Sequence, residues 1–205
     1  MQNTYVELLH LKDAQKLADY TSIDVDLHSA CEFAAILRDE MQRRQPNVSL
    51  FEPLTVATII RYARPFASGI RLRLFEEEGM NILTDEQRAK HQRFLEIRNK
   101  YIAHSVNAFE ESQPVARYWV ERVQEEGITS IECNHTRVVS LSRQELQDIM
   151  KLATTWLQYV RQKLNEEKAR LLPIVRAIPL ETLLKNTPRP MIVNTSQPQK
   201  RRGRP

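Results

Sequence analysis

The sequence predicts a mainly α-helical protein: a bundle of four to five helices with a small antiparallel β insertion at about 115–141 and a disordered basic C-terminal tail. Helical apolar spacing through most of the chain, two capping-box patterns and β-rich runs confined to the insertion lead to this prediction. With 205 residues, 41% of them hydrophobic, the chain can bury a core without a disulfide or metal. We expect one helical domain over 1–185 and a flexible tail over 186–205.

The first half of the chain has the pattern of helices separated by prolines. A loose helical pattern over 5–20 is followed by a clearer apolar stripe over 22–44, which a proline ends. Pro53 suits a first helical position, and we expect the helix that follows to cover 54–75. Pro65 should kink that helix, because the residue before a proline is pushed away from α geometry.

A capping box and a change of period mark the middle of the chain. The residues Thr84-Asp85-Glu86-Gln87 open a helix that we expect to reach about His104. The runs 115–123, 128–133 and 137–141 are rich in β formers and are separated by Glu-Glu-Gly and Asn-His turn candidates. They predict a small antiparallel sheet or a hairpin.

The last third combines a long helix with a charged end. A second capping box begins at Ser142 and opens a helix with a regular apolar stripe, after which Pro173 and Pro179 are expected to break the chain into short pieces. Residues 185–205 carry six basic side chains and no acidic one, whereas 1–184 has a net charge of −2 and the whole chain +4. A basic tail on a near-neutral body is typical of an auxiliary nucleic-acid contact.

The final residues, Lys200-Arg-Arg-Gly-Arg-Pro205, match the core of an AT-hook. Gly203 allows close approach to DNA, and Arg202 and Arg204 would enter the negative minor groove of A·T-rich sequence. The alternative, favoured by the weak specificity of a single hook, is a cationic tail that tethers RNA or DNA by counterion release.

Several classes of protein are excluded or disfavoured. The four glycines form neither GxGxxG nor GxxxxGK, so dinucleotide-binding and P-loop sites are excluded. Cys31 and Cys133 form no CxxC motif and have no histidine at ligand spacing, so we expect no metal, no cofactor and a reducing cytoplasm. No apolar run approaches the ~20 residues of a membrane-spanning helix, so no membrane contact is expected.

The helix expected over 84–104 has an unusual apolar face. At 100° per residue, Arg98 falls inside the apolar arc, between Phe94 and Ile102, and His104 borders that arc. A guanidinium directed toward a core is costly unless an anion or a polar cleft receives it. We therefore expect this helix to line a pocket or a subunit junction.

The segment "RNKYIAHS", with Arg98 followed by Asn99 and then by His104 six residues after the arginine, resembles the HEPN superfamily, and so does "RYARPF" upstream. The similarity is strongest over about 50–110. It implies a small helical bundle that forms a homodimer and cleaves RNA without a metal, as a toxin or phage-defence effector with a possible antitoxin protein. In that family pattern Arg98 and His104 would be catalytic, and Asn99 would support them.

The residue types suit that chemistry. An imidazole with a pKa near ~6.5 can take the ribose 2′-OH proton or protonate the leaving 5′ oxygen, and a guanidinium can hold two phosphate oxygens. On one helix Arg98 and His104 point about 120° apart, so one copy makes a poor site. A twofold dimer would bring both copies of the helix to one cleft.

Each assignment has a structural alternative. His104 can instead be a histidine that interacts favourably with the dipole at the C-terminal end of the helix. Arg98 can pair with a buried carboxylate such as Asp26 or Asp39. Asn99 can orient Arg98 or be solvated. His91 shares the face of Arg98 and has two interpretations, a further member of the site or an ordinary surface histidine, and the second is favoured.

The neighbouring basic residues also have two interpretations. Arg61 and Arg64 lie one helical turn apart, so with Lys100 they either extend a phosphate-binding surface or are surface charges at a kink. Two other functions compete with a ribonuclease. One is a non-catalytic HEPN-like module that binds nucleic acid or a partner protein, and the other is a DNA-binding regulator that works through the tail.

Overall fold

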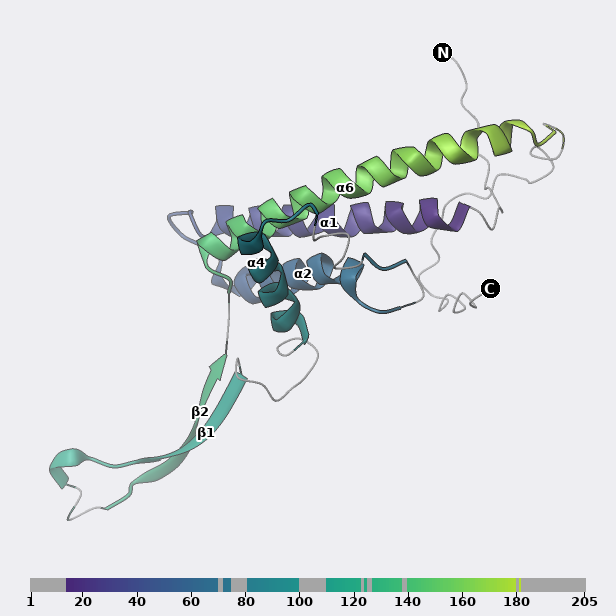
Figure 1. Ribbon diagram of the computed structural model, residues 1–205. Coiled ribbons are helices and arrows are strands. Elements are labelled where there is room, and N and C mark those ends of the chain that lie inside the picture. The colour runs from purple at the N-terminus through teal and green to yellow at the C-terminus, as the bar shows by residue number, and fades with distance from the viewer. Residues whose placement is uncertain are drawn as a thin grey trace.

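In the computed structural model of the protein, the described residues form four α-helices, three short 3-10 segments and one two-stranded antiparallel sheet (Figure 1). The structure describes residues 14–69, 72–74, 81–99, 110–122, 124, 127–137, 140–179 and 181. The mainly helical class with a small antiparallel insertion is confirmed. Among these residues, no helix combines the length and hydropathy needed to cross a membrane. The helices are α1 (Gln15–Glu40), α2 (Phe51–Ala63), α4 (Asp85–Ile97) and α6 (Arg143–Arg176).

The N-terminal helix is continuous where two helical stretches were expected. α1 runs from Gln15 to Glu40 without a break near residue 20, and residues 1–13 lie outside the described part of the chain. Its buried positions include Ile23, Leu27 and Leu37, all fully covered by the neighbouring helices. α1 packs along α6 on one side and α2 on the other, as Figure 1 shows. Burial of this continuous face explains why the helix does not stop.

α2 ends earlier than the expected residue 75. The helix stops at Ala63, and Arg64–Phe66 tighten into a 3-10 turn before Ala67 becomes extended, with φ −80° and ψ 144°. Pro65 accounts for this ending, because it has no N–H to continue the helical ladder. The chain then turns back on itself, and the backbone N–H of Leu74 donates to the Pro65 carbonyl at 2.9 Å.

Both predicted capping boxes form. The Gln87 N–H donates to Thr84 Oγ1 at 3.2 Å, and the Thr84 N–H donates to the Gln87 side chain at 2.9 Å, which starts α4. Ser142 and Glu145 make the equivalent pair at the start of α6. α4 ends at Ile97, short of the expected residue 104, and residues 100–109 lie outside the described part.

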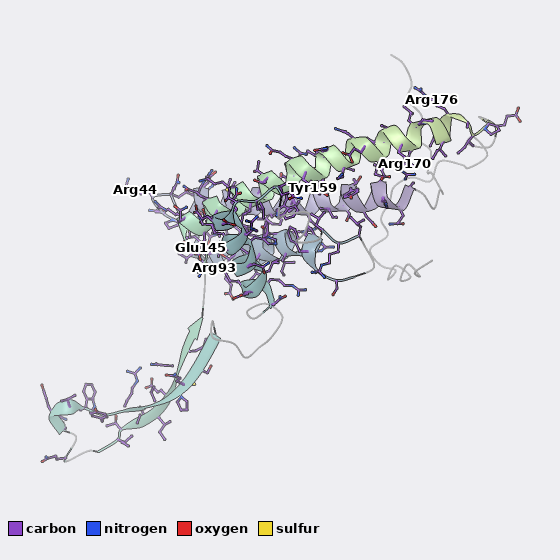
Figure 2. All side chains as sticks on the ribbon, viewed as in Figure 1. Arg44, Arg93, Glu145, Tyr159, Arg170 and Arg176 are labelled. Carbon is purple, nitrogen blue, oxygen red and sulfur yellow. The ribbon has the colours of Figure 1, made fainter. Side chains whose placement is uncertain are left out.

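Ion pairs join α4 to the first turns of α6. Arg93 and Glu145 meet at 2.7 Å where the two helices cross, as labelled in Figure 2, and Lys90 reaches Asp148 at 3.0 Å. Partial burial alone would raise the pKa of the Glu145 carboxyl. Hydrogen bonds from Ser142 and Arg93 outweigh that effect and hold its pKa below the usual value.

α6 continues through Pro173, where a break was expected. The helix extends to Arg176, and the Ala177 N–H still donates to the Pro173 carbonyl at 3.1 Å. Pro173 is exposed and lies close to the helix end, so the carbonyl that its ring leaves without a helical partner can bind water. This placement limits the cost of the proline to one local distortion.

The core is centred on an aromatic cluster between α2, α4 and α6. Trp156 and Tyr62 are fully buried, and the Phe66 ring is tilted by 60° against the Trp156 ring, with the two ring centroids 5.0 Å apart. His91 belongs to this cluster: it is 3% exposed, and its Nδ1 lies 2.7 Å from the Tyr62 hydroxyl. The favoured interpretation of His91 as a surface histidine was therefore wrong. Burial raises the pKa of Tyr62 well above its usual value.

The β insertion is a single hairpin that projects away from the helices, near the end of the bundle where α6 begins (Figure 1). β1 (Glu110–Arg117) pairs with β2 (Ser130–Arg137) in an antiparallel register that sets Pro114 opposite Cys133. Gly127 has φ +63° in the connection. The predicted Asn-His turn was wrong, because both residues lie within β2, and so the expected three β runs reduce to two strands.

Candidate functional site

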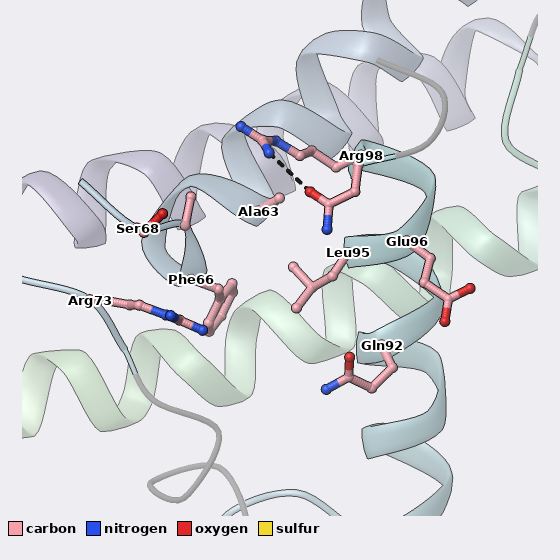
Figure 3. Close-up of a pocket in the computed structure, with 10 residues that line it drawn as sticks. Ala63, Phe66, Ser68, Arg73, Gln92, Leu95, Glu96 and Arg98 are labelled. Carbon is pink, nitrogen blue, oxygen red and sulfur yellow. Dashed lines mark hydrogen bonds between the residues drawn. The ribbon is translucent and has the colours of Figure 1, made fainter. Parts of the chain in front are cut away.

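The candidate site is a cleft of about 340 Å³ between the end of α4 and the segment that follows α2 (Figure 3). The capping box at Thr84 sets where α4 starts, and Pro65 ends α2 so that the chain turns toward α4. The walls carry two guanidiniums, one carboxylate, several neutral polar groups and apolar side chains. The lining residues are Ala63, Phe66, Ala67, Ser68, Arg73, Gln92, Leu95, Glu96, Arg98 and Asn99.

Arg98 lies in the cleft wall, as the helical spacing predicted. The side chain is half-buried at the C-terminal cap of α4, and its Nη1 donates to the Asn99 side-chain oxygen at 2.9 Å. The backbone at these two residues is π-helical, a local widening that often occurs at functional sites. Asn99 therefore orients the guanidinium through a contact that carries no charge.

The carboxylates considered as partners for Arg98 contact other arginines. Asp26 Oδ1 accepts from Arg61 Nη1 at 2.7 Å and lies 3.2 Å from Arg64 Nη1. Asp39 contacts Arg38, the residue before it, at 2.8 Å. Among the described residues, the structural alternative for Arg98 is therefore not realised with either carboxylate.

Arg61 and Arg64 have a structural role that sequence spacing did not reveal. Both hold one carboxylate that is only 3% exposed, while their own side chains are 37% and 49% exposed. A buried carboxylate needs such partners, because leaving it unpaired costs several kcal/mol. The group of three charges keeps a net charge of +1 and shows it to solvent through the two guanidiniums.

Sequence analysis missed Arg73, which supplies the second guanidinium of the cleft. Figure 3 shows Arg73 beside Phe66, across the cleft from Gln92. The signal was present in the alternation Arg-Leu-Arg-Leu at 71–74. In an extended segment alternate side chains face opposite sides, and here Leu72 and Leu74 pack on the core while Arg73 is exposed.

Several predicted site residues lie outside the described part of the chain. These are His104, Lys100, Arg202 and Arg204, together with the AT-hook-like end of the tail. The cleft is thus defined by Arg98, Asn99 and the residues that face them. His91 does not line it, because that ring is in the aromatic core.

The cleft can bind an anion that carries an apolar part. Two guanidiniums match phosphate oxygens, and Phe66 with Leu95 offers an apolar wall. Within the residues described, no group of three or more His, Cys, Asp or Glu side chains is arranged to hold a metal ion. Comparison of the chain with protein-family models, with curated proteins and with solved structures gives no match.

Proposed function

We propose that the chain is a metal-independent endoribonuclease of the HEPN type that acts as a toxin or phage-defence effector. The observation that carries the proposal is the environment of Arg98. The guanidinium is half-buried in a cleft, and its contact within the described residues is the neutral amide of Asn99. A half-buried guanidinium that a neutral amide orients favours a site that binds a phosphate.

The lining of the cleft supports single-stranded RNA as the ligand. Arg98 and Arg73 are spaced around an apolar wall that contains Phe66, and Ser68 and Gln92 add hydrogen-bonding groups. Proteins that bind single-stranded RNA combine phosphate contacts with a flat apolar surface for an unstacked base and with polar groups for its edge. The volume of about 340 Å³ suits one nucleotide rather than a duplex.

The proposed mechanism divides the work between a clamp and an acid–base pair. His104 takes the 2′-OH proton, the 2′ oxygen attacks phosphorus, and the 5′ oxygen leaves with a proton from the second copy's imidazole. The products are a 2′,3′-cyclic phosphate and a 5′-hydroxyl. Arg98 stabilises the charge that develops on the phosphoryl oxygens, and Asn99 keeps Arg98 in place.

The surrounding basic residues would hold the rest of the RNA. Arg61 and Arg64 retain exposed guanidinium surface beside Asp26, and Lys100 follows the cleft in sequence. Arg202 and Arg204 would attach the tail to RNA or DNA by counterion release. We assign these residues to affinity, so their loss should affect binding more than the rate of the bound complex.

The test is RNA cleavage by the purified full-length chain in excess chelator. We expect Arg98→Ala and His104→Ala to lower the cleavage rate by about a hundredfold or more. Arg93→Ala is the matched control, because it removes an arginine from the same helix outside the cleft. A substrate with 2′-deoxyribose at the scissile position should be bound and not cleaved.

A second candidate, a non-catalytic module that binds nucleic acid, is favoured by one observation: two cleft arginines can hold phosphates without an imidazole. The same assay separates the two functions. Binding of RNA that depends on Arg98, with no cleavage under any condition, would establish the module and refute the nuclease. Wild-type cleavage by either Arg98→Ala or His104→Ala would remove that residue from the mechanism.

A further inference from the structure

The hairpin formed by residues 110–137, which we call the arm, stands clear of the helices in Figure 1. Each strand has eight residues, and the sheet has no third strand within the described part of the chain. An isolated two-stranded hairpin is marginally stable in water, and stable hairpins gain a third strand or a packing partner. The arm therefore has the form of an element that is completed by something outside the described part of the chain.

The outer half of the arm exposes large apolar side chains. Trp119 is 67% exposed and Val120 is 80% exposed, although both are residue types that normally lose most of their surface in a folded protein. Together with neighbouring side chains they line a groove of about 630 Å³ at the tip. The exposed apolar residues of the arm are Tyr118, Trp119, Val120, Ile128 and Ile131.

The apolar area of the arm is large enough for a stable interface. An aromatic side chain alone can bury about 150–250 Å², so the five side chains amount to several hundred Å². Monomeric proteins rarely expose a larger contiguous apolar patch, and a stable interface buries roughly 800 Å² on each partner. In a twofold dimer each copy supplies one arm and receives one, so the arm contact is made twice.

The net charge of the arm indicates which partner it binds. Residues 110–137 carry six acidic and three basic side chains, a net of −3, so the remainder of the chain carries +7 against the total of +4. A nucleic acid would be repelled by this arm, and so would a second arm. The rest of a second copy has the opposite net charge, with +6 in residues 185–205 and +1 in the part of 1–184 outside the arm.

We propose that the arm docks on a second copy of this chain, at a surface outside that copy's own arm, and that the exchange of two arms forms a dimer. The proposal does not depend on the ribonuclease mechanism, because no residue of the Arg98 cleft takes part. The arm contact is independent of whether the α4 helices of two copies also pair. The apolar tip supplies the binding energy, and the opposite net charges speed association.

Tryptophan fluorescence tests the proposal on the unmodified chain. The chain has two tryptophans: Trp156 is fully buried in the core, and Trp119 is at the tip of the arm. Dilution through the dissociation range, followed in parallel by sedimentation, should shift the emission to the red and raise quenching by acrylamide. Trp119→Phe should still associate and show no shift. Emission that does not change between monomer and dimer would overturn the proposal.

Substitution supplies the second test. Trp119→Ser and Ile131→Ser should each raise the dissociation constant by about thirtyfold, the effect of losing one anchor residue at an interface. The matched control is Val48→Ser, which removes a 66% exposed valine from the bundle and should leave association unchanged. Equal association of the arm variants and the control would refute the arm contact. If those variants still cleaved RNA as wild type, the proposed function would stand.

Discussion

The pairing of Asp26 with two arginines leads to an asymmetric stability prediction. Asp26 is buried, whereas Arg61 and Arg64, at 2.7 and 3.2 Å from its Oδ1, each keep more than a third of the side chain exposed. Removal of the carboxylate lets both arginines turn to water. Removal of both arginines leaves a buried carboxylate without its two cationic partners, which is the costlier change.

The expected magnitudes follow from these environments. Asp26→Asn should lower the free energy of unfolding by about 1–3 kcal/mol, the loss of charge-assisted hydrogen bonds. The double variant Arg61→Ala/Arg64→Ala should lower it by about 3–5 kcal/mol, the cost of breaking a buried pair from one side. Addition of Asp26→Asn to that double variant should then restore at least about 1 kcal/mol, because no buried charge remains.

The assay is urea unfolding at pH 7, followed by far-ultraviolet circular dichroism and tryptophan fluorescence. Coincident transitions would justify a two-state treatment of all four proteins. The reasoning is refuted if the double variant is no less stable than Asp26→Asn, or if the triple variant is no more stable than the double. The triple variant also tests the proposed contact of Arg61 and Arg64 with RNA, because it removes both arginines without leaving a buried charge.

Three further predictions concern stability. Glu145→Gln should make the free energy of unfolding depend less on pH on the acid side. The lowered pKa of the Glu145 carboxyl contributes stability above pH 4.5, and this stability is lost as the pH falls through the folded-state pKa. The free energies from urea unfolding at pH 7 and pH 3.5 should therefore differ less in the variant than in wild type. Tyr62→Phe should lower the free energy of unfolding by about 1–3 kcal/mol, because buried His91 loses the hydroxyl 2.7 Å from its Nδ1. The substitution should also remove a tyrosine that ionises only when the protein unfolds at alkaline pH, and an unchanged ultraviolet titration would contradict this. Pro173→Ala should raise the melting temperature and protect the end of α6 from hydrogen exchange, whereas Pro179→Ala, beyond the helix, should do neither.

The starts of α4 and α6, the disruption of the helix at Pro65 and the position of the β insertion were predictable because they depend on residues close in sequence. The capping boxes at Thr84 and Ser142 satisfy backbone groups within three residues, and Pro65 acts on its own turn. The apolar period likewise placed Arg98 inside the apolar arc of its helix and predicted that this helix lines a pocket or a subunit junction, and the structure has a cleft there. In each case the deciding interaction spans one helical turn.

The continuity of α1 and the partners of charged residues depended on the tertiary structure. Asp26 and Arg61 are 35 residues apart, so their pairing needs the packing of α2 on α1. Arg73 reaches the Arg98 cleft because the chain folds back after Pro65. Local patterns contain no information about which surfaces meet, since burial and low dielectric, which make such contacts strong, exist only after the helices pack.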